Sequence, residues 1–415
     1  RDLHRHEGAG GVVEVKENWQ IATLGEIVTF QSGVGFPLDL QGKTAGDYPL
    51  AKVGDISRVG RSSENVISAA DHYVDSQDLI RLKTKPIPQG SVLFAKIGES
   101  IRNNHKVLAG CSLLIDNNAM AAIPSSRINS QFLFYCMRSI DLNRVATSTT
   151  VPSIRKSELE KLQIPLPPLP EQRRIAQILD KAEALRAKRR AALAKLDALA
   201  QSIFLEMFGH DLGSGSQSIQ SLIDAGVILL HKDGNHGSLY PRPEDFRENG
   251  VPFLSAKSID ENGNISGGIE YLCVEKADKL RLGKIEKGDI LLAHNASVGK
   301  VAVYDGRFER AIIGTSLTAF RPNRDRLLPM FLWSSFRSEI FQSQLMKNMG
   351  QTTRNQVPIT AQRQLKISIP PLPLQQAFAR RVEAIETLKA AHRASLAKLD
   401  ALFASLQHRA FRGEL

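Results

Sequence analysis

A long internal repeat constrains this chain more than any other feature of its sequence. Residues 162–208 and 365–411 align without a gap at a constant offset of 203, and about 22 of the 47 positions are identical. The identities include a PPLP-x-Q element and the block LAKLDAL. Chance does not produce such a match, so the chain is a tandem of two similar parts.

Each copy of the repeat joins a proline-rich element to a helical pattern. Prolines lack an amide donor and fix φ, so this element predicts a rigid, extended exit from a sheet. Beyond it, apolar residues recur every three to four positions, and neither copy has an internal Pro or Gly after its start. This pattern predicts a helix of roughly 34 residues, on the order of 50 Å long, in each copy.

Two long helices with matching apolar seams are expected to pair with each other. Antiparallel pairing is favoured because it gives the two parts of the tandem a pseudo-two-fold relation. The alternative is that each helix packs only on its own domain. The seam residues expected to serve the spacer or to contact partners are Ile175, Leu185, Leu196, Leu199, Leu388, Leu396, Leu399 and Leu402.

Before each helix lies a stretch of about 150 residues rich in β-like runs, and the two stretches echo each other in order. YPLAKVGDIS (48–57) parallels VPFLSAKSID (251–260), and QGSVLFAKIG (89–98) parallels KGDILLAHNA (287–296). The fold class is therefore α+β, with two mixed α/β domains and two long helices. The predicted order is an N-terminal tail (1–17), a first domain (18–170), a first helix (171–211), a second domain (212–373) and a second helix (374–415).

The two helices resemble each other more closely than the two domains do. This difference indicates that the two helices bind the same kind of partner, whereas the two domains bind different targets. The alternative explanation is that long helices tolerate less sequence drift than β-rich domains.

Composition and charge narrow the classes of protein further. Hydrophobic residues make up 42% of the 415 residues, no apolar run approaches the length of a membrane span, and the first 20 residues lack an apolar signal region. We therefore expect neither export nor membrane insertion. The three cysteines have no CxxC spacing, which predicts a reducing, cytoplasmic setting. A formal net charge of +11 favours a polyanionic partner.

The tandem resembles the specificity (S) subunit of a type I restriction-modification system. The resemblance covers residues 18–415 and rests on the opening NWQIATLGEIVTFQSG, the HKDGNHG…YPR segment at 231–242, the GDIL turn at 288–291, the LPPLPEQRRIAQIL junction that ends at 179, and the closing AFRGEL. One departure is Leu374, which stands where the first copy has Glu171, although Gln375 still matches Gln172. The first residue is Arg rather than Met, which suggests an incomplete N-terminus.

The resemblance implies two target recognition domains, each of which reads one half of a split double-stranded DNA sequence. The helices would hold the domains apart and dock two methylation (M) subunits, and restriction (R) subunits would join the complex. The chain itself would be non-catalytic and would hold no cofactor, while S-adenosylmethionine, ATP and Mg²⁺ would belong to the partner subunits. Changing the helix length should then change the unread gap in the site.

The residues themselves support a non-catalytic role. The chain has no GxxxxGK[ST], HExxH, GxSxG, GxGxxG or Asn-Pro-Pro-aromatic motif, so it lacks the usual signatures of nucleotide, protease, hydrolase and methyltransferase chemistry. His231, Asp233 and His236 could suggest a metal site, but no third ligand follows at a usual spacing and the segment reads first as a polar loop. Two alternatives stay open: a lone restriction or methylation enzyme, and a coiled-coil scaffold with non-DNA ligands.

The DNA-contacting residues are expected in polar loops at equivalent strand ends of the two domains. Such loops offer amide, basic and hydroxyl groups suited to base edges and phosphates. In the first domain the candidates are Arg102, Asn103, Asn104, His105, Lys106, Thr149 and Thr150. In the second domain they are His231, Lys232, Asn235, His236, Tyr240, Arg242, His294, Asn295, Lys300, Thr352, Thr353 and Arg354.

Overall fold

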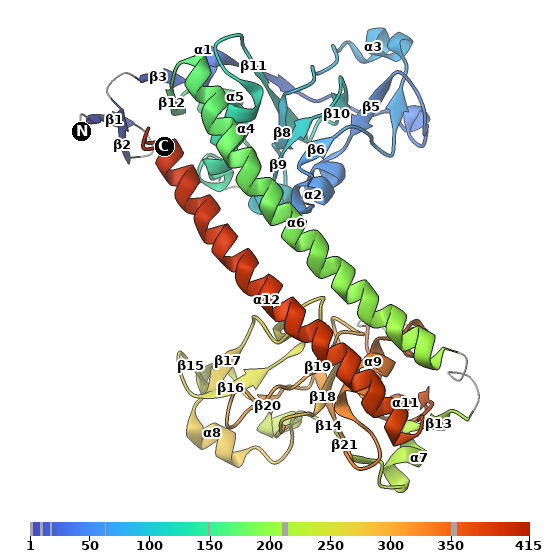
Figure 1. Ribbon diagram of the computed structural model, residues 1–415. Coiled ribbons are helices and arrows are strands. Elements are labelled where there is room, and N and C mark those ends of the chain that lie inside the picture. The colour runs from blue at the N-terminus through green and yellow to red at the C-terminus, as the bar shows by residue number, and fades with distance from the viewer. Residues whose placement is uncertain are drawn as a thin grey trace. The chain divides into compact units, whose positions relative to one another are not determined.

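The computed structural model describes residues 3–8, 11–16, 19–62, 64–147, 150–209, 215–349 and 355–415. The chain forms two compact units. Unit 1 comprises Arg1–Ala192 and His392–Leu415, and unit 2 comprises Leu193–Ala391. Each unit therefore contains one β-rich domain together with a segment of both long helices, α6 (Leu169–Phe208) and α12 (Leu372–Ala410) (Figure 1).

Unit 1 is built on a five-stranded sheet of order β4-β11-β8-β9-β6. Its strands are β4 (Val28–Ser32), β11 (Ala119–Pro124), β8 (Val92–Ala95), β9 (Lys106–Ala109) and β6 (Val66–Ile67), and all pairs are antiparallel except β6 with β9. A second sheet has the order β10-β5-β7, formed by β10 (Leu114–Ile115), β5 (Tyr48–Ala51) and β7 (Tyr73–Val74). Two strand pairs complete the unit: β1 (Leu3–Gly8) with β2 (Gly11–Lys16), and β3 (Gln20–Thr23) with β12 (Gln163–Leu166).

Five short helices complete the domain of unit 1: α1 (Leu24–Ile27), α2 (Val53–Arg61), α3 (Ser76–Leu82), α4 (Ser130–Ser139) and α5 (Lys156–Glu160). Helix α4 begins at the Asn129 cap, whose side chain accepts from the amides of Gln131 and Phe132. The buried face of α4 packs in one hydrophobic cluster with strands of the main sheet, with the start of α6 and with Phe403 of α12.

Unit 2 has a similar plan, with four strands in its main sheet and four in its second sheet among the described residues. Its main sheet has the order β14-β21-β18-β19, formed by β14 (Ile228–Asp233), β21 (Leu317–Pro322), β18 (Ile290–Ala293) and β19 (Val301–Val303). The second sheet has the order β15-β17-β16-β20, formed by β15 (Phe246–Arg247), β17 (Glu270–Leu272), β16 (Val251–Leu254) and β20 (Ile312–Ile313), and β13 (Gln217–Ser218) pairs with β22 (Lys366–Ile367). The helices are α7 (Ile219–Asp224), α8 (Val274–Lys279), α9 (Pro329–Arg337), α10 (Glu339–Lys347) and α11 (Ile359–Gln362).

The sequence echoes between the two domains correspond to equivalent elements. YPLAKVGDIS contributes β5 and VPFLSAKSID contributes β16, while QGSVLFAKIG contributes β8 and KGDILLAHNA contributes β18. The equivalent strands β5 and β16 each have one parallel and one antiparallel neighbour. The equivalent strands β8 and β18 each lie between two antiparallel neighbours. The tandem organisation predicted from the repeat is therefore confirmed at the level of sheet topology.

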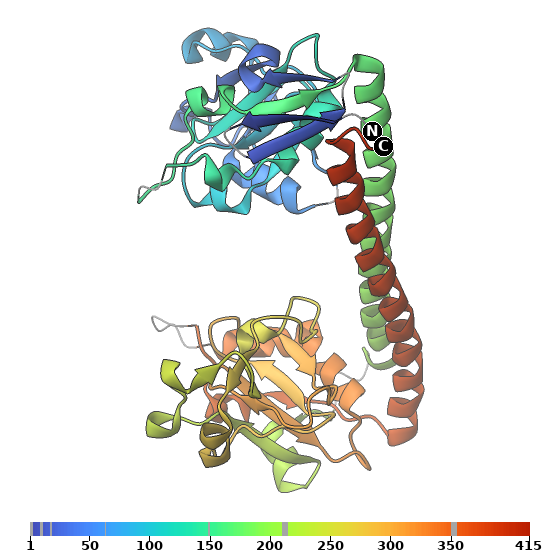
Figure 2. The same cartoon turned by 90° about the vertical axis from the view of Figure 1, so that its left-hand side faces the viewer.

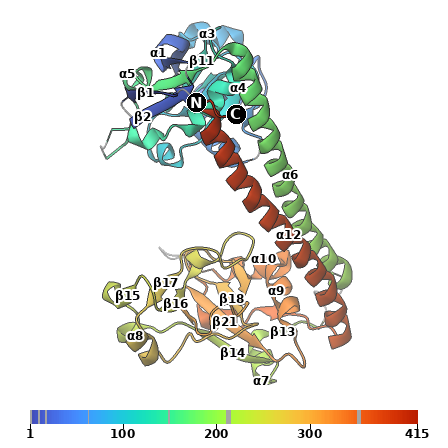
Figure 3. The ribbon, with the colours of Figure 1, turned by 60° about the vertical axis from the view of Figure 1, so that its left-hand side comes forward.

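The long helices pair antiparallel inside each unit. In unit 1, Arg174 contacts the carbonyl of Leu415 and Arg186 contacts Asp400, so residue numbers rise along α6 while they fall along α12 (Figure 2). In unit 2, Lys389 pairs with Asp197 while Phe378 packs on Phe204, which gives the same direction (Figure 3). The expected fold class, with two α/β domains and an antiparallel helix pair, is confirmed.

Candidate nucleic-acid interface

The polar loops of unit 2 leave its main sheet at a single edge. Strands β14 and β18 flank β21 and run in the same direction, and Asp233 of β14 and Leu292 of β18 are both in register with Thr318 (Figure 1). The loops that follow β14 and β18 therefore start side by side. These are the HKDGNHG and HNASVGK segments that the sequence singled out.

A third segment reaches the same edge of unit 2. The amide of Val357 donates to the carbonyl of His294 at 2.9 Å, the amide of Ala296 donates to the carbonyl of Asn355 at 3.3 Å, and Asn295 forms a β-bridge with Gln356. The segment that begins at Asn355 thus lies against the loop that follows β18. The expected contacts Thr352, Thr353 and Arg354 lie outside the described residues.

Three of the expected DNA contacts in unit 2 are buried and serve the loops internally. The His231 ring packs at a tilt against Phe320, and its Nε2 lies 3.2 Å from Gln362 Oε1, while burial lowers the pKa of this imidazole to about 4. His294 Nδ1 lies 2.8 Å from the Thr318 hydroxyl, and burial lowers its pKa as well. Both imidazoles are therefore neutral near pH 7, where they add no charge to this edge.

Asn235 is the third buried member of this group. Its side-chain amide donates to the carbonyl of Leu282 at 2.6 Å, and its oxygen accepts from the amides of Arg281 and Leu282. The residue before it, Gly234, lies so close to the backbone of Ile313 and Gly314 that a Cβ atom would sit 2.5 Å from the Ile313 carbonyl oxygen. The Gly-Asn pair therefore fixes the course of the loop after β14.

The other expected contacts of unit 2 keep polar groups exposed or partly exposed. His236 is exposed and its Nε2 lies 2.7 Å from Asp233 Oδ2. The Lys300 ammonium is 2.8 Å from Glu261 and also donates to the carbonyl of Ile259. Side chains that remain open to a ligand at this edge or along the following loop are Lys232, His236, Tyr240 and Arg242, with Asn295 half-buried beside them.

Unit 1 builds the same edge from its own strands. Ser32 at the end of β4 and Phe94 near the end of β8 are both in register with Met120 of β11. Gly33 follows at the position equivalent to Gly234, and a Cβ atom there would lie 1.9 Å from the carbonyl oxygen of Asp116. The absence of a side chain at Gly33 therefore lets the chain after β4 pass close to the backbone of Asp116.

The threonine-containing loop of unit 1 joins this edge as its counterpart does in unit 2. Gly98 donates to the carbonyl of Pro152 at 2.9 Å, Ile97 forms a β-bridge with Ser153, and the amide of Ile154 donates to the carbonyl of Lys96 at 2.8 Å. Thr150 is exposed, and Thr149 lies outside the described residues. Segments 54 to 58 residues apart in the chain thus form one composite surface.

Two of the expected contacts in unit 1 brace the loop from inside. The Lys106 ammonium donates to Asn104 Oδ1 and to the carbonyl of Ile140, both at 2.6 Å, and Asn104 Oδ1 also accepts from the amide of Leu142. Asn104 has a positive φ of 54°, a conformation that Asn tolerates better than most residues. Burial lowers the pKa of Lys106 to about 7, so this amine is a loop brace of reduced charge.

The remaining candidates of unit 1 face outward from the short 3₁₀ turn Glu99–Asn103 that follows β8. Arg102 and Asn103 are exposed, with the Arg102 Nε atom 3.1 Å from Glu99. His105 is half-buried against Gly60, and burial lowers its pKa. Arg102, Asn103 and Thr150 are therefore the expected contacts that the fold leaves accessible in unit 1.

Two basic residues at this edge escaped the sequence reasoning. Lys96 stands where unit 2 has His294, and its backbone makes the bond that joins the two loops. Arg155 is exposed directly after the same junction. The alignment of VLFAKIG with ILLAHNA already placed Lys96 at a strand end, so that signal was available in the sequence.

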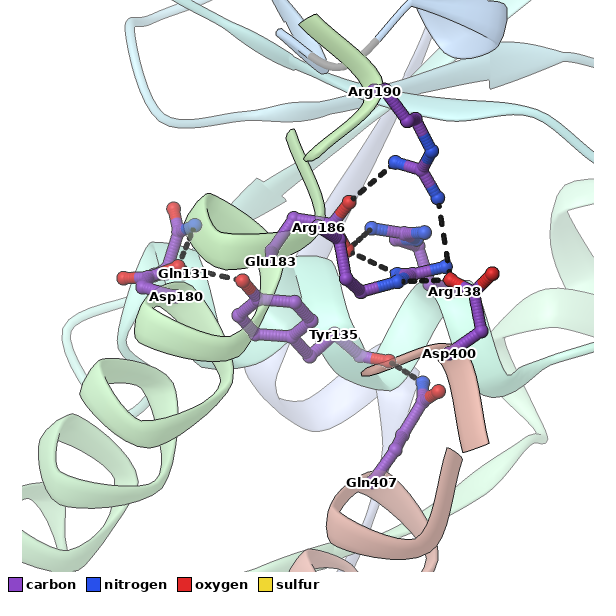
Figure 4. Close-up of polar contacts among 9 residues, drawn as sticks. All are labelled: Gln131, Tyr135, Arg138, Asp180, Glu183, Arg186, Arg190, Asp400 and Gln407. Carbon is purple, nitrogen blue, oxygen red and sulfur yellow. Dashed lines mark hydrogen bonds and ion pairs between the residues drawn. The ribbon is translucent and has the colours of Figure 1, made fainter. Parts of the chain in front are cut away.

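A charged cluster links the domain of unit 1 to both helices (Figure 4). Glu183 of α6 accepts from Arg186 at 2.6 Å and from Arg138 and Arg190 at 3.4 Å. Asp400 of α12 lies 2.6 Å from Arg186 and 3.5 Å from Arg190. The arginines of α6 that could have been free to pair with a partner protein are thus partly engaged within the chain.

Unit 2 contains the same cluster with the roles of the two helices exchanged. Lys389 of α12 is fully buried, and its ammonium lies 2.7 Å from Asp197 of α6 and 2.5 Å from Glu386. Asp197, Glu386 and Lys389 are the repeat equivalents of Asp400, Glu183 and Arg186. The repeated sequence therefore encodes one helix-pairing motif that is used twice.

The expected seam residues fall into three groups. Ile175 is buried in the hydrophobic cluster of unit 1, and Leu196, Leu396 and Leu399 are half-buried. About half of the surface of the remaining four is exposed to solvent, and these are Leu185, Leu199, Leu388 and Leu402. They form two repeat-related pairs, Leu185 with Leu388 and Leu199 with Leu402, so both copies of the repeat leave the same positions uncovered.

The part of the chain that the structure describes offers neither a metal site nor a membrane span. Among the described residues, no group of three or more His, Cys, Asp or Glu side chains gathers closely enough to hold a metal ion. No helix in that part combines the length and apolar character needed to cross a bilayer.

Comparisons with known proteins agree with this geometry. The family described as the type I restriction modification DNA specificity domain matches residues 16–195 and 235–401. The MjaVIII specificity subunit of Methanocaldococcus jannaschii is 22% identical over 91% of this chain and 88% of its own length. The EcoBI specificity subunit of Escherichia coli is 19% identical over 99% of this chain and 89% of its own length.

A solved structure has the same fold along nearly the whole chain. The type I restriction-modification S subunit from M. genitalium superposes with a TM-score of 0.53 at 15% sequence identity and covers 95% of this chain and 96% of its own. This likeness extends the agreement from sequence motifs to the fold.

Proposed function

Because the chain belongs to the DNA specificity family of type I restriction-modification systems, it is a recognition subunit rather than an enzyme, and we propose that units 1 and 2 each read one half of a two-part DNA site. The resemblance drawn from the sequence motifs is confirmed by the family match.

The observation that carries the proposal is the convergence of three loops at one sheet edge in each unit. The sheets are equivalent, yet the exposed side chains on their loops differ, which is what two readers of different half-sites require. In unit 1 the open side chains are Arg102, Asn103 and Thr150. In unit 2 they are His236, Tyr240 and Arg242, with Lys232 and Asn295 beside them.

These side chains have suitable chemistry for duplex DNA. An asparagine amide pairs with the edge of adenine, an arginine fork pairs with guanine, and hydroxyl and ammonium groups hold phosphates. The buried candidates do not contact DNA themselves but hold the loops in place. Asn104 and Lys106 hold the first loop and Asn235 and His294 hold the second, so that the exposed groups meet DNA in a preset geometry.

For the helices we propose a docking role. Each unit has two of the exposed leucines, Leu185 and Leu402 in unit 1 and their repeat equivalents Leu388 and Leu199 in unit 2. Two methylation subunits would dock on the helices at these leucines, one on each unit, and restriction subunits would join the assembly. S-adenosylmethionine, ATP and Mg²⁺ would be bound by those partners.

The test is to co-express the full chain with the methylation subunit of its own system and to map methylated bases by single-molecule sequencing. We expect a split motif of two short half-sites with a constant gap. Failure to methylate any split motif, despite a stable purified complex, would overturn the proposal, and sequence-blind DNA binding would favour a scaffold role.

Variants assign the half-sites to the units. The double substitution Arg102→Ala and Asn103→Ala should relax or abolish one half-site, and His236→Ala with Tyr240→Ala should affect the other, at roughly 5- to 150-fold per lost base contact. Arg127→Ala and Arg324→Ala are matched controls, because both exposed side chains follow strands that end at the opposite edge of their sheets. If both double variants altered the same half-site, the assignment of one reader per unit would be wrong.

A further inference from the structure

A cavity of about 230 Å³ opens in unit 2 between α6 and α9, bounded also by the start of α10. Ala200, Phe204 and Leu205 of α6 form one wall, and Trp333, Ser334 and Arg337 of α9 form the other. Arg337 lies over the Trp333 ring, with its guanidinium carbon 4.4 Å from the ring centroid. None of the residues that line the cavity belongs to the loops assigned to DNA.

The equivalent place in unit 1 is filled by the chain's own phenylalanine. Phe403 of α12 is buried there, with its ring centroid 6.1 Å from that of Tyr135 and 5.7 Å from the guanidinium carbon of Arg138. The repeat offset of 203 makes Ala200 the counterpart of Phe403. Helices α4 and α9 both carry Phe-Leu near their start and Arg-Ser at their end, which makes Ser334 and Arg337 the counterparts of Tyr135 and Arg138.

The cavity therefore arises from residue differences between the two units. Two aromatic side chains of unit 1 are replaced in unit 2 by alanine and serine, while the arginine that lines the site is kept. The remaining space exceeds the roughly 150 Å³ that suffices for a benzene molecule in an apolar cavity. A guanidinium held beside the opening favours the face of an aromatic ring, as Arg138 does with Phe403.

We propose that this cavity receives an aromatic side chain of the methylation subunit that docks on unit 2. The inference rests on the proposed docking of methylation subunits on the helices. Leu205 lines the mouth of the cavity and about half of its surface is exposed, so apolar surface continues from the cavity onto the outside of α6. An aromatic anchor seated in a pocket with an apolar surround is the usual centre of a protein interface.

One consequence is that the two methylation subunits bind unequally. The site on unit 1 is closed by Phe403 and offers only its surface, whereas the site on unit 2 also offers the cavity. The first methylation subunit therefore binds to unit 2, and its affinity for unit 2 is higher than that of the second methylation subunit for unit 1.

The experiment titrates the full chain with the purified methylation subunit of its own system and measures both stepwise dissociation constants by native mass spectrometry and calorimetry. Ala200→Phe fills the cavity from α6, as Phe403 does in unit 1, and Ser334→Tyr fills it from α9. Ala198→Phe is the matched control, since Ala198 is an exposed alanine of the same helix that does not line the cavity. Thermal unfolding of each variant verifies that the chain remains folded.

The expected result is a loss of at least about tenfold in the tighter constant for both filling variants, with the weaker constant and the Ala198→Phe variant unchanged. Filling variants that are folded and bind both methylation subunits as tightly as the original chain would overturn this inference alone. If the unaltered chain binds no methylation subunit at all, the proposed docking function fails and the inference fails with it.

Discussion

Gln172 and Gln375 make the same three hydrogen bonds in the two units. The side-chain amide of Gln172 donates to the carbonyls of Pro167 (2.8 Å) and Arg127 (3.1 Å), and its oxygen accepts from the amide of Asn129. Gln375 contacts Pro370, Arg326 and Leu328 in the same way. The glutamine of the PPLP-x-Q element thus fastens the start of each long helix to its domain.

Replacing this glutamine should destabilise its unit. Gln172→Ala leaves two carbonyls and one amide without partners in a buried place, so we expect a fall in the free energy of unfolding of about 2–4 kcal/mol. Urea denaturation measures the change. Gln177→Ala, an exposed glutamine of the same helix, should stay within about 0.5 kcal/mol of the original chain. An equal loss in both variants would contradict the anchoring role.

The two charged clusters should differ in their tolerance of substitution. Each substitution leaves its cation with one acidic partner, Glu386 for Lys389 and Glu183 for Arg186, so burial decides the difference. Asp197→Ala weakens the pairing of Lys389, whose side chain is only 2% exposed, and we expect a loss of about 2 kcal/mol. Asp400→Ala should cost only about 1 kcal/mol, because Asp400 is 44% exposed. Chemical denaturation of the two variants under the same conditions tests this order, and a larger loss for Asp400→Ala would refute it.

Phe403 should contribute strongly to the stability of unit 1. Phe403→Ala opens a cavity between Tyr135, Arg138 and Arg186, so we expect the free energy of unfolding to fall by about 3 kcal/mol. The neighbouring Leu402→Ala removes an exposed side chain and should change it by less than about 0.5 kcal/mol. Comparable losses from the two substitutions would show that Phe403 does not fill a core position.

Because the pKa of the buried His231 imidazole is lowered, we expect the protein to lose stability in mild acid. The imidazole of the unfolded chain protonates near its ordinary pKa of 6.5, whereas burial lowers the folded pKa to about 4, so the unfolded chain binds more protons between these values. The free energy of unfolding should therefore fall by up to about 3 kcal/mol as the pH drops from 6.5 to 4, with no contribution from His231 above that window.

Denaturation curves across this pH range test the His231 prediction. His231→Gln removes the titrating group while keeping a side chain that can pair with Gln362, so its stability should depend less steeply on pH. His408→Gln alters an exposed histidine of α12 and should leave the slope as it was. A His231→Gln slope identical to that of the original chain would mean that this imidazole does not titrate abnormally.

Much of this protein is determined by local patterns in its sequence. The proline-rich exits and the helical periodicity act over neighbouring residues, and the repeat and the strand echoes appear when the sequence is aligned with itself. Together they indicated the tandem, the long helices, the family and the loops that gather at the sheet edges. The same alignment placed Gln375 opposite Gln172, and the structure gives both residues identical contacts.

Only the tertiary structure decided which polar loop residues face a ligand. Lys106, Asn235 and His294 have the composition of a DNA-binding loop, but each also bonds to a partner 24 to 47 residues away, which holds its side chain inside the protein. The cavity beside Ala200 likewise depends on a phenylalanine present at one repeat position and absent at the other. Burial and hydrogen bonding depend on contacts between segments that are distant in the chain. The spacing of residues within one segment does not reveal those contacts.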